Sequence, residues 1–266
     1  MSYDGGKGAM YHKIINRIPP HRVYIEPFLG GGAVMKRKRP AAVNIGLELD
    51  LAVLKSTVWS VLREQGAPER EIIALSFEPL AAGHVRNDGG ISKSERTMMA
   101  TASWAGTDWE FRHEDALGFL LALNCRGDEF IYLDPPYLLE TRQNGKRIYR
   151  HEMGFNDHVR LLEIIRELDC MVAISGYWSE LYADMLYGWR MDSWTARTRQ
   201  GVATEWLWMN YPEPTLLHDY RYLGDTYRER DRIKRKKARL VAKLQRMQPQ
   251  ERYALLAALE EAFGDA

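Results

Sequence analysis

The order of apolar and polar residues predicts strands that alternate with helices. Strands are expected in "RVYIE", "AAVNIGLEL", "FIYL", "CMVAISGY" and "TEWLWMNY", and a short one before Asp115. Helical periodicity covers residues 51–75, with a break around "EQGAPE", and returns in "ALGFLLAL", "DHVRLLEIIRELD" and "SELYADMLYGW". Asn156 or Asp157 is the expected N-cap of the second of these later helices. Alternation of this kind predicts an α/β fold with a mostly parallel, doubly wound sheet.

The same pattern predicts the domain organisation. One α/β domain is expected from residues 1–54 and 109–215. Residues 55–108 form an insertion, because periodicity weakens after Phe77 and "NDGG" and "AGTDW" are turn signals. Residues 216–266 form a C-terminal extension with apolar residues at helical spacing on both sides of Pro249, which predicts a hairpin of two amphipathic helices. Its apolar stripe is expected to cover the protein's own core or, alternatively, to pair with a second copy.

The net charge of +1 conceals a segregation of charge. Residues 227–247 contain ten Lys or Arg and two acidic residues, a net charge of +8, so the remaining 27 basic and 34 acidic residues carry −7. A basic segment on a mildly acidic body fits contact with a polyanion, and it fits a solvated helix equally well.

Composition excludes several classes of protein. The longest nearly apolar run, "ALGFLLALNC", is about half of the ~20 residues that a membrane span needs, and the N-terminus lacks the pattern of a signal peptide, so a cytoplasmic protein is expected. Cys125 and Cys170 have no CxxC spacing, and the histidines form no HxxxH pair, so neither a disulfide framework nor a metal site is indicated.

Glycines and acidic residues mark the ends of the predicted strands. In "EPFLGGGAV" a strand leads into a glycine turn and the start of a helix, so the backbone and the helix N-terminus can approach a ligand. Glu48, at the end of the next strand, is placed to accept hydrogen bonds from the ribose of a nucleoside. Asp115 could bind the amino group of an adenine, although capping of the "ALGFLLAL" helix is the favoured role. Lys7, on a glycine-rich run, suits a carboxylate.

The segment "FIYLDPPYLL" gives the strongest chemical signal. Pro135 and Pro136 lock the turn after Asp134 and remove two N–H donors, which leaves a rigid site that only accepts hydrogen bonds. An exocyclic amine fits such a site, because it can donate one hydrogen to the Asp134 carboxylate and one to the Pro135 carbonyl. Tyr137 offers a flat surface on which the ring that carries the amine can stack.

These motifs resemble the Dam-type DNA adenine-N6 methyltransferases, above all the short phage and prophage members. The resemblance runs from "GGKG" through "YIEPFLGGGAV" and "DPPY" to "ISGYWSELY" and "TEWLWMNY". It implies a Rossmann-like sheet, S-adenosylmethionine as cofactor, and transfer of a methyl group to the N6 amine of a flipped adenine in duplex DNA, without a metal. It also implies residue roles. Those of the catalytic tetrad fall to Asp134, Pro135, Pro136 and Tyr137, and those of cofactor binding to Tyr3, Lys7, Glu26, Pro27, Phe28, Gly30, Gly32, Glu48 and Asp115.

Other features differ from the family or leave a choice open. The family's ribose acid is often aspartate, so Glu48 and Asp50 compete for that role. The short insertion at 55–108 is a possible target-recognition lobe. Two further segments, expected to be loops, are "LLETRQNGKRIYRHEM" and "TARTRQGVAT", whose candidate DNA contacts are Arg142, Lys146, Arg147, Arg150, Arg197 and Arg199. The alternatives are methylation of cytosine N4 or of RNA adenine, or a DNA-binding protein without catalysis. A homodimer through the C-terminal helices would suit a palindromic target.

Overall fold

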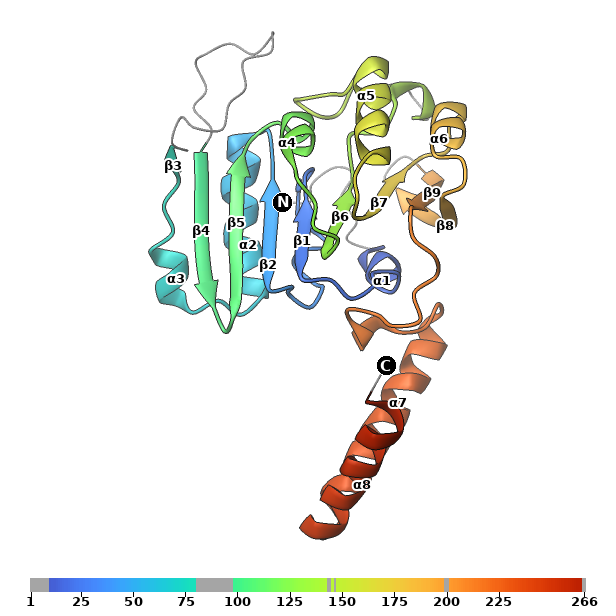
Figure 1. Ribbon diagram of the computed structural model, residues 1–266. Coiled ribbons are helices and arrows are strands. Elements are labelled where there is room, and N and C mark those ends of the chain that lie inside the picture. The colour runs from blue at the N-terminus through green and yellow to red at the C-terminus, as the bar shows by residue number, and fades with distance from the viewer. Residues whose placement is uncertain (1–9, 80–97, 143–144, 146, 199–200, 265–266) are drawn as a thin grey trace. The chain divides into compact units, whose positions relative to one another are not determined.

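The computed structural model describes residues 10–79, 98–142, 145, 147–198 and 201–264 (Figure 1), and gives only the backbone of residues 196–198 and 201. Contacts between residues divide the chain into two compact units, Met1–His218 and Asp219–Ala266. Each unit is described by itself.

The first unit is built on one mixed sheet. In the part of the chain that the structure describes, nine strands have the order β3-β4-β5-β2-β1-β6-β7-β9-β8. The strands are β1 (Val23–Glu26), β2 (Val43–Leu47), β3 (Glu78–Pro79), β4 (Met98–Trp104), β5 (Thr107–His113), β6 (Glu129–Leu133), β7 (Met171–Gly176), β8 (Arg190–Thr198) and β9 (Gly201–Met209).

The centre of the sheet is parallel. β5, β2, β1, β6 and β7 pair in parallel, and in chain order they have the arrangement 3-2-1-4-5 of a doubly wound, Rossmann-like fold. Every residue of β6 is buried, as expected for a strand covered on both faces. β9 runs antiparallel to β7, and β8 antiparallel to β9. The predicted α/β class is therefore confirmed.

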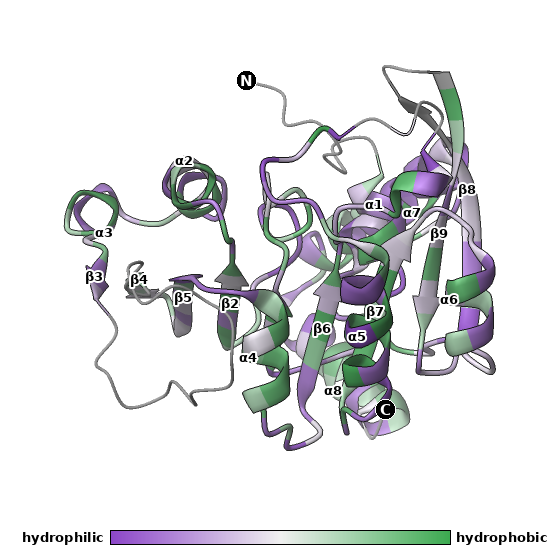
Figure 2. Cartoon of the chain, turned by 90° about the horizontal axis from the view of Figure 1, so that it is seen from above, coloured by the Kyte–Doolittle hydropathy of each residue, from purple (hydrophilic) through white to green (hydrophobic). Residues whose placement is uncertain are grey.

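Helices cover both faces of this sheet. Figure 2 shows α2 and α3 on one face and α4 and α5 on the other. The break predicted around "EQGAPE" is confirmed, because α2 ends before Gly66, whose φ is +77°, and α3 begins after Pro68. The helices of this unit are α1 (Tyr11–Ile15), α2 (Leu51–Glu64), α3 (Glu69–Ile73), α4 (Ala116–Ala122), α5 (Phe155–Arg166) and α6 (Glu180–Met185), and a 3-10 turn spans Leu139–Thr141.

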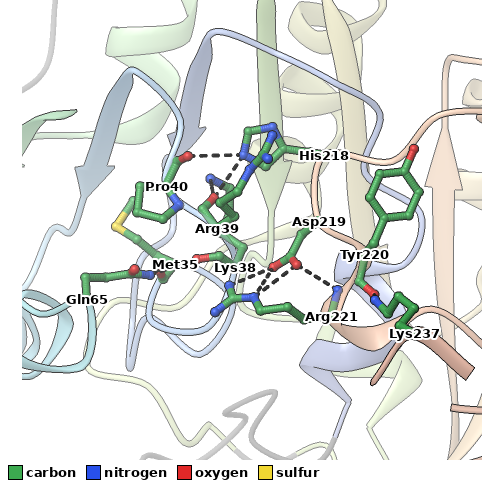
Figure 3. Close-up of polar contacts among 10 residues, drawn as sticks. All are labelled: Met35, Lys38, Arg39, Pro40, Gln65, His218, Asp219, Tyr220, Arg221 and Lys237. Carbon is green, nitrogen blue, oxygen red and sulfur yellow. Dashed lines mark hydrogen bonds and ion pairs between the residues drawn. The ribbon is translucent and has the colours of Figure 1, made fainter. Parts of the chain in front are cut away.

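The expected helix after the glycine triplet is absent, and this prediction was wrong. Residues 33–37 form successive turns. The side chain of Gln65 donates to the carbonyl oxygens of Met35 and Lys38 at 2.6 and 2.9 Å (Figure 3). Those two carbonyls therefore bond to Gln65, the C-cap of α2, instead of continuing a helical ladder, and Pro40 then removes a further donor.

Two more expectations need correction. "TARTRQGVAT" is not wholly a loop, because Thr195–Thr198 belongs to β8 and Gly201–Thr204 to β9, and sequence reasoning missed β8. The N-cap of α5 is Gly154, two to three residues before the predicted cap. The carboxylate of Asp157 nevertheless reaches back to accept the Gly154 N–H at 2.8 Å. The predicted insertion also holds β4 and the start of β5, a hairpin that extends the main sheet.

The described part of the second unit, residues 219–264, holds the two α-helices that the sequence predicts, after a short 3-10 turn at Tyr220–Tyr222. α7 (Tyr227–Gln245) is capped by Thr226, whose hydroxyl accepts the Glu229 N–H at 3.1 Å, and α8 (Pro249–Phe263) begins at its proline. Neither helix contains a buried residue. The exposed large apolar or aromatic side chains of this unit are Tyr220, Tyr227, Leu240, Val241, Tyr253, Leu255, Leu256, Leu259 and Phe263.

Candidate functional site

Acidic residues gather at the carboxyl edge of the parallel strands. Glu26 ends β1, and Glu48, Asp115 and Asp134 follow β2, β5 and β6. The order of the strands reverses between β1 and β6, which are neighbours. Ligands of doubly wound sheets bind at such a reversal, outside the carboxyl ends of the strands. The two acids at the reversal itself are Glu26 and Asp134, and the negative charge of Asp134 contributes to raising the pKa of Glu26.

The carboxylate of Asp134 is oriented by a neighbouring strand. Ser175, fully buried on β7, donates its hydroxyl hydrogen to Oδ1 of Asp134 at 2.9 Å. The hydroxyl of Tyr132, on β6, lies 3.0 Å from the same serine oxygen and can donate to it. Pro135 is buried immediately beyond the carboxylate. The turn that the two prolines stiffen is thus also tied to β7 through a side chain.

The ring of Tyr137 is held from two directions. Its hydroxyl donates to Oε2 of Glu205, on β9, at 2.6 Å. The ring of Tyr177 packs edge-on against it, with ring centroids 4.7 Å apart. Burial, with a contribution from the charges of Asp134 and Glu205, raises the pKa of Tyr137 well above its usual value, so the hydroxyl remains protonated and can donate.

The glycine turn after β1 depends on left-handed backbone. Gly30 and Gly32 have φ values of +47° and +60°. A Cβ on Gly32 would lie 3.1 Å from methyl groups of Thr57 and Val61 on α2, so the turn packs directly on that helix. The hydroxyl of Thr57 donates to the Gly30 carbonyl at 2.6 Å. The two predicted cofactor residues before the turn, Pro27 and Phe28, are buried and half-buried.

Glu48 and Asp50 have different roles in the structure. Glu48 accepts the Gly30 N–H at 2.9 Å and the Asp50 N–H at 2.9 Å, and burial raises the pKa of Glu48. Asp50 caps α2 by accepting from Ala52 and Val53 at 2.9 and 3.3 Å. Partial burial opposes ionisation of Asp50, but those N–H groups and Arg150 outweigh it and lower its pKa. Glu48 is therefore the acid that contacts the glycine turn.

Glu26 is a buried carboxyl beside Asp134. It accepts the hydroxyl of Tyr24 at 2.9 Å and the Met35 N–H at 3.2 Å. Burial, the largest influence, together with the charge of Asp134, raises the pKa of Glu26 to about 8 against the opposing effect of these hydrogen bonds. The carboxyl is mostly neutral at pH 7, so Asp134 has little competing negative charge at the end of β1.

Asp115 occupies the N-cap of α4. Its carboxylate accepts the Gly118 N–H at 2.8 Å, which confirms the favoured role as a helix cap. Contact with an adenine amino group stays a prediction, since a carboxylate that accepts one N–H has further acceptor capacity.

The predicted DNA contacts fall into three groups. Arg142 forms a bidentate ion pair with Glu152, at 2.9 and 2.7 Å, and both side chains are largely buried, which gives this arginine a structural role that the sequence did not suggest. Arg147 is exposed, and Arg150 is exposed with Nη1 3.4 Å from Asp50. Lys146 and Arg199, together with the side chain of Arg197, lie outside the described residues, and so do the predicted cofactor residues Tyr3 and Lys7.

Sequence reasoning missed Ser175, Glu205 and Glu152. Glu205 carried a usable signal, because it is an acid inside the apolar run "TEWLWM" and is nevertheless buried. Serine within "ISGY" has no such signal, since a small polar residue is common in strands. Among the described residues, no group of three His, Cys, Asp or Glu side chains could hold a metal ion, and no helix is long and apolar enough to cross a membrane.

Comparisons with known proteins give only distant likenesses. No protein-family model and no curated protein matches the sequence. Solved structures with a similar fold include an rRNA methylase from Streptococcus thermophilus, at 10% identity over 76% of this chain and 93% of that chain with a TM-score of 0.39. Magnesium protoporphyrin IX methyltransferase from Synechocystis PCC 6803 has 9% identity over 77% and 83%, with a TM-score of 0.41. TrmK of M. capricolum has 7% identity over 96% of both chains, with a TM-score of 0.40. Likenesses this weak carry no argument about substrate or cofactor.

Proposed function

We propose that the protein is an S-adenosylmethionine-dependent methyltransferase that methylates the exocyclic N6 amine of adenine in duplex DNA. The observation that carries the proposal is the position of Asp134-Pro135-Pro136-Tyr137. This turn follows the strand β6 at the point where the order of the parallel strands reverses. A site that only accepts hydrogen bonds, next to an aromatic ring, suits an amine on a flat heterocycle.

The hydrogen bonds within the site support this role. Ser175 donates to Oδ1 of Asp134, which holds the carboxylate in a fixed orientation. An amine that donates to Asp134 and to the Pro135 carbonyl has its lone pair directed away from both. Asp134 then accepts the proton that the methylated amine loses, and it need not be a strong base because that amine has become acidic. The chain's contribution to the rate is chiefly orientation.

The residues around the glycine turn fit the proposed cofactor. The positive φ values of Gly30 and Gly32 expose backbone at the carboxyl edge of β1. Each oxygen of Glu48 accepts one backbone N–H, and a carboxylate can accept about four hydrogen bonds, so capacity remains for two ribose hydroxyls. S-adenosylmethionine, when bound, supplies an electrophilic methyl group. Asp115 would hold the adenine amino group, and the predicted roles of Tyr3 and Lys7 complete the set.

Duplex DNA is the proposed partner, and α7 supplies a surface for it. At 100° per residue, six of the nine Lys and Arg residues of α7 lie within an arc of about 100°. A stripe of this kind fits the phosphate backbone of a duplex, which requires charge and no base recognition. The six residues are Arg228, Arg232, Arg235, Lys236, Arg239 and Lys243.

We propose a homodimer as the second partnership, formed through the C-terminal helices. It is supported by the exposed apolar side chains of α8, including Leu256, Leu259 and Phe263, which are 43%, 47% and 71% exposed. Light scattering should give twice the mass of the chain, and Leu256→Asp should halve it. A monomeric wild-type protein would refute this partnership without affecting the proposed chemistry.

Transfer of labelled methyl from S-adenosylmethionine to mixed-sequence duplex DNA, followed by digestion to nucleosides, tests the function. Label should appear in N6-methyl-2′-deoxyadenosine and disappear in Asp134→Asn, which keeps the shape of the side chain but loses the charge. Asp128→Asn is the matched control, because Asp128 lies just before the opposite end of the same strand and should retain activity.

The alternatives give different results in the same assay. Label on cytosine N4 would support the proposed site but identify cytosine as the base. If DNA stays unlabelled and RNA tested in its place is labelled, the substrate is RNA. Binding of DNA without any thermal shift by S-adenosylmethionine would indicate a DNA-binding protein that is not an enzyme, and would refute the proposal.

A further inference from the structure

We infer that Glu205 and Arg142 are positioning residues that hold Tyr137 at its two ends and thereby set the plane on which the substrate's ring stacks. The inference deepens the proposed function and rests on it. Neither residue belongs to the catalytic tetrad, and the sequence suggested a DNA contact for Arg142. The two bonds come from segments far apart in the chain, β9 and the segment after the 3-10 turn.

Glu205 fixes the hydroxyl end of the ring. It is 7% exposed, and its Oε2 accepts the Tyr137 hydroxyl at 2.6 Å, a short distance typical of a bond to a charged acceptor. The edge-on contact with Tyr177 restricts rotation of the same ring. A ring that stacks on the substrate must keep a nearly constant tilt if it is to orient an amine. A hydrogen bond at the hydroxyl, the atom farthest from the backbone, limits that tilt most effectively.

Arg142 fixes the backbone end. Its Nη2 donates to the Tyr137 carbonyl at 2.5 Å, while the guanidinium forms the bidentate pair with Glu152. The side chains of Arg142 and Glu152 are only 8% and 7% exposed. Glu152 also accepts the N–H groups of Ile148 and Tyr149, at 2.6 and 2.9 Å. The turn after the tetrad is therefore closed by one buried charge pair, whose arginine is already committed to the Tyr137 backbone.

The hydrogen bond from the Tyr137 hydroxyl to Glu205 can be tested even if the protein shows no catalytic activity. In protein labelled with [ζ-¹³C]tyrosine, the Tyr137 signal is the one that Tyr137→Phe removes. Glu205→Gln should shift that signal, because an amide accepts a weaker hydrogen bond than a carboxylate. Glu129→Gln is the matched control, since Glu129 is 6% exposed at the opposite end of β6 and binds the N–H groups of Arg126 and Gly127. An unmoved Tyr137 signal in Glu205→Gln would overturn the inference, even if the protein proved to methylate nothing.

Kinetics then test whether the bond matters to the reaction. Glu205→Gln and Tyr137→Phe should each lower kcat about ten-fold with little change in the KM for S-adenosylmethionine. The double variant should be no slower than Tyr137→Phe alone, because both changes remove the same bond. Glu129→Gln combined with Tyr137→Phe should show independent effects. If the losses in kcat of Glu205→Gln and Tyr137→Phe multiply in the double variant, positioning through the Tyr137 hydroxyl is refuted.

Arg142→Lys tests the backbone end, since lysine keeps the charge and loses the fork. A lower kcat with an unchanged KM for DNA supports positioning. An unchanged kcat with a raised KM for DNA, and a weaker dependence of binding on salt, would make Arg142 a phosphate contact and overturn this half of the inference. If wild-type protein transfers no methyl group to DNA or RNA, the proposed function fails, while the tyrosine signal still decides the hydrogen bond.

Discussion

A pair of stacked histidines, of which His218 is buried and His21 is half-buried, predicts that the protein loses stability in mild acid. His21 and His218 stack with ring centroids 3.9 Å apart. Nε2 of His218 lies 3.0 and 3.3 Å from the carbonyl oxygens of Arg39 and Pro40 (Figure 3), to which it donates a hydrogen. Nδ1 of His21 donates to the Pro19 carbonyl at 2.8 Å, and among the described residues its Nε2 has no hydrogen-bond partner. Protonation of His21 would therefore add an N–H donor at Nε2 that has no acceptor among the described residues.

The pKa values of both histidines are lowered for the same reasons. Burial is the largest influence on both groups, followed by the charge of Lys38, and together they lower the pKa of His21 to about 2 and that of His218 to about 4. An unfolded histidine has a pKa of about 6.5. As the pH falls below 6.5, the histidines of the unfolded chain bind protons that those of the folded chain do not. The free energy of unfolding therefore decreases as the pH drops from 6.5 toward the pKa values of the folded protein. From pH 7 to pH 5 this amounts to about 2 kcal/mol for each histidine.

Urea unfolding at pH 7 and pH 5 measures the effect. Glu26 acts in the opposite direction, because its raised pKa stabilises the folded state below pH 4.5 and this contribution is lost as the pH rises toward 8. The change between two pH values must therefore be compared between variants. In His21→Phe the loss from pH 7 to pH 5 should be smaller than in the wild type by about 2 kcal/mol. His151→Asn, at an exposed position, should behave as the wild type. An equal loss in His21→Phe and the wild type would refute the reasoning.

Three further predictions concern the glycine turn, a helix cap and the basic stripe. Gly32→Ala should lower the unfolding free energy by roughly 1–3 kcal/mol and weaken cofactor binding, because φ is +60° and the added methyl would crowd α2. In the control Gly118→Ala the added methyl meets only an ordinary contact, so neither stability nor cofactor binding should fall in this way. Asp50→Ala should lower the unfolding free energy by about 1 kcal/mol through loss of the α2 cap, and Asp50→Asn should restore most of it. Replacing three stripe residues by Gln, namely Arg232, Arg239 and Lys243, should make the plot of log K for duplex DNA against log salt less steep by about 2.7. Three Gln replacements off the stripe, at positions 230, 234 and 237, should change that slope less.

The sequence determined the elements whose causes are local. Alternating apolar runs predicted the parallel strands, the break at Gly66 and Pro68 divided two helices, and Asp115 was assigned correctly as a cap. The position of Asp134 at a carboxyl edge also followed from the sequence, because a strand followed by a stiff turn fixes which end of the strand the side chain occupies. These features depend on residues within a few positions of each other.

Tertiary structure decided everything that depends on partners distant in the chain. The segment after Gly32 resembles the start of a helix, but Gln65, about thirty residues away, takes up its carbonyls. Arg142 looked like a surface contact until folding buried it against Glu152. Only the fold shows that Glu48 accepts the Gly30 N–H while Asp50 caps α2, and which of the two binds a ribose stays a prediction. The partners Ser175 and Glu205 reach the tetrad only because β7 lies beside β6 and β9 lies beside β7 in the sheet. The pairing of strands is a long-range property that no local pattern encodes.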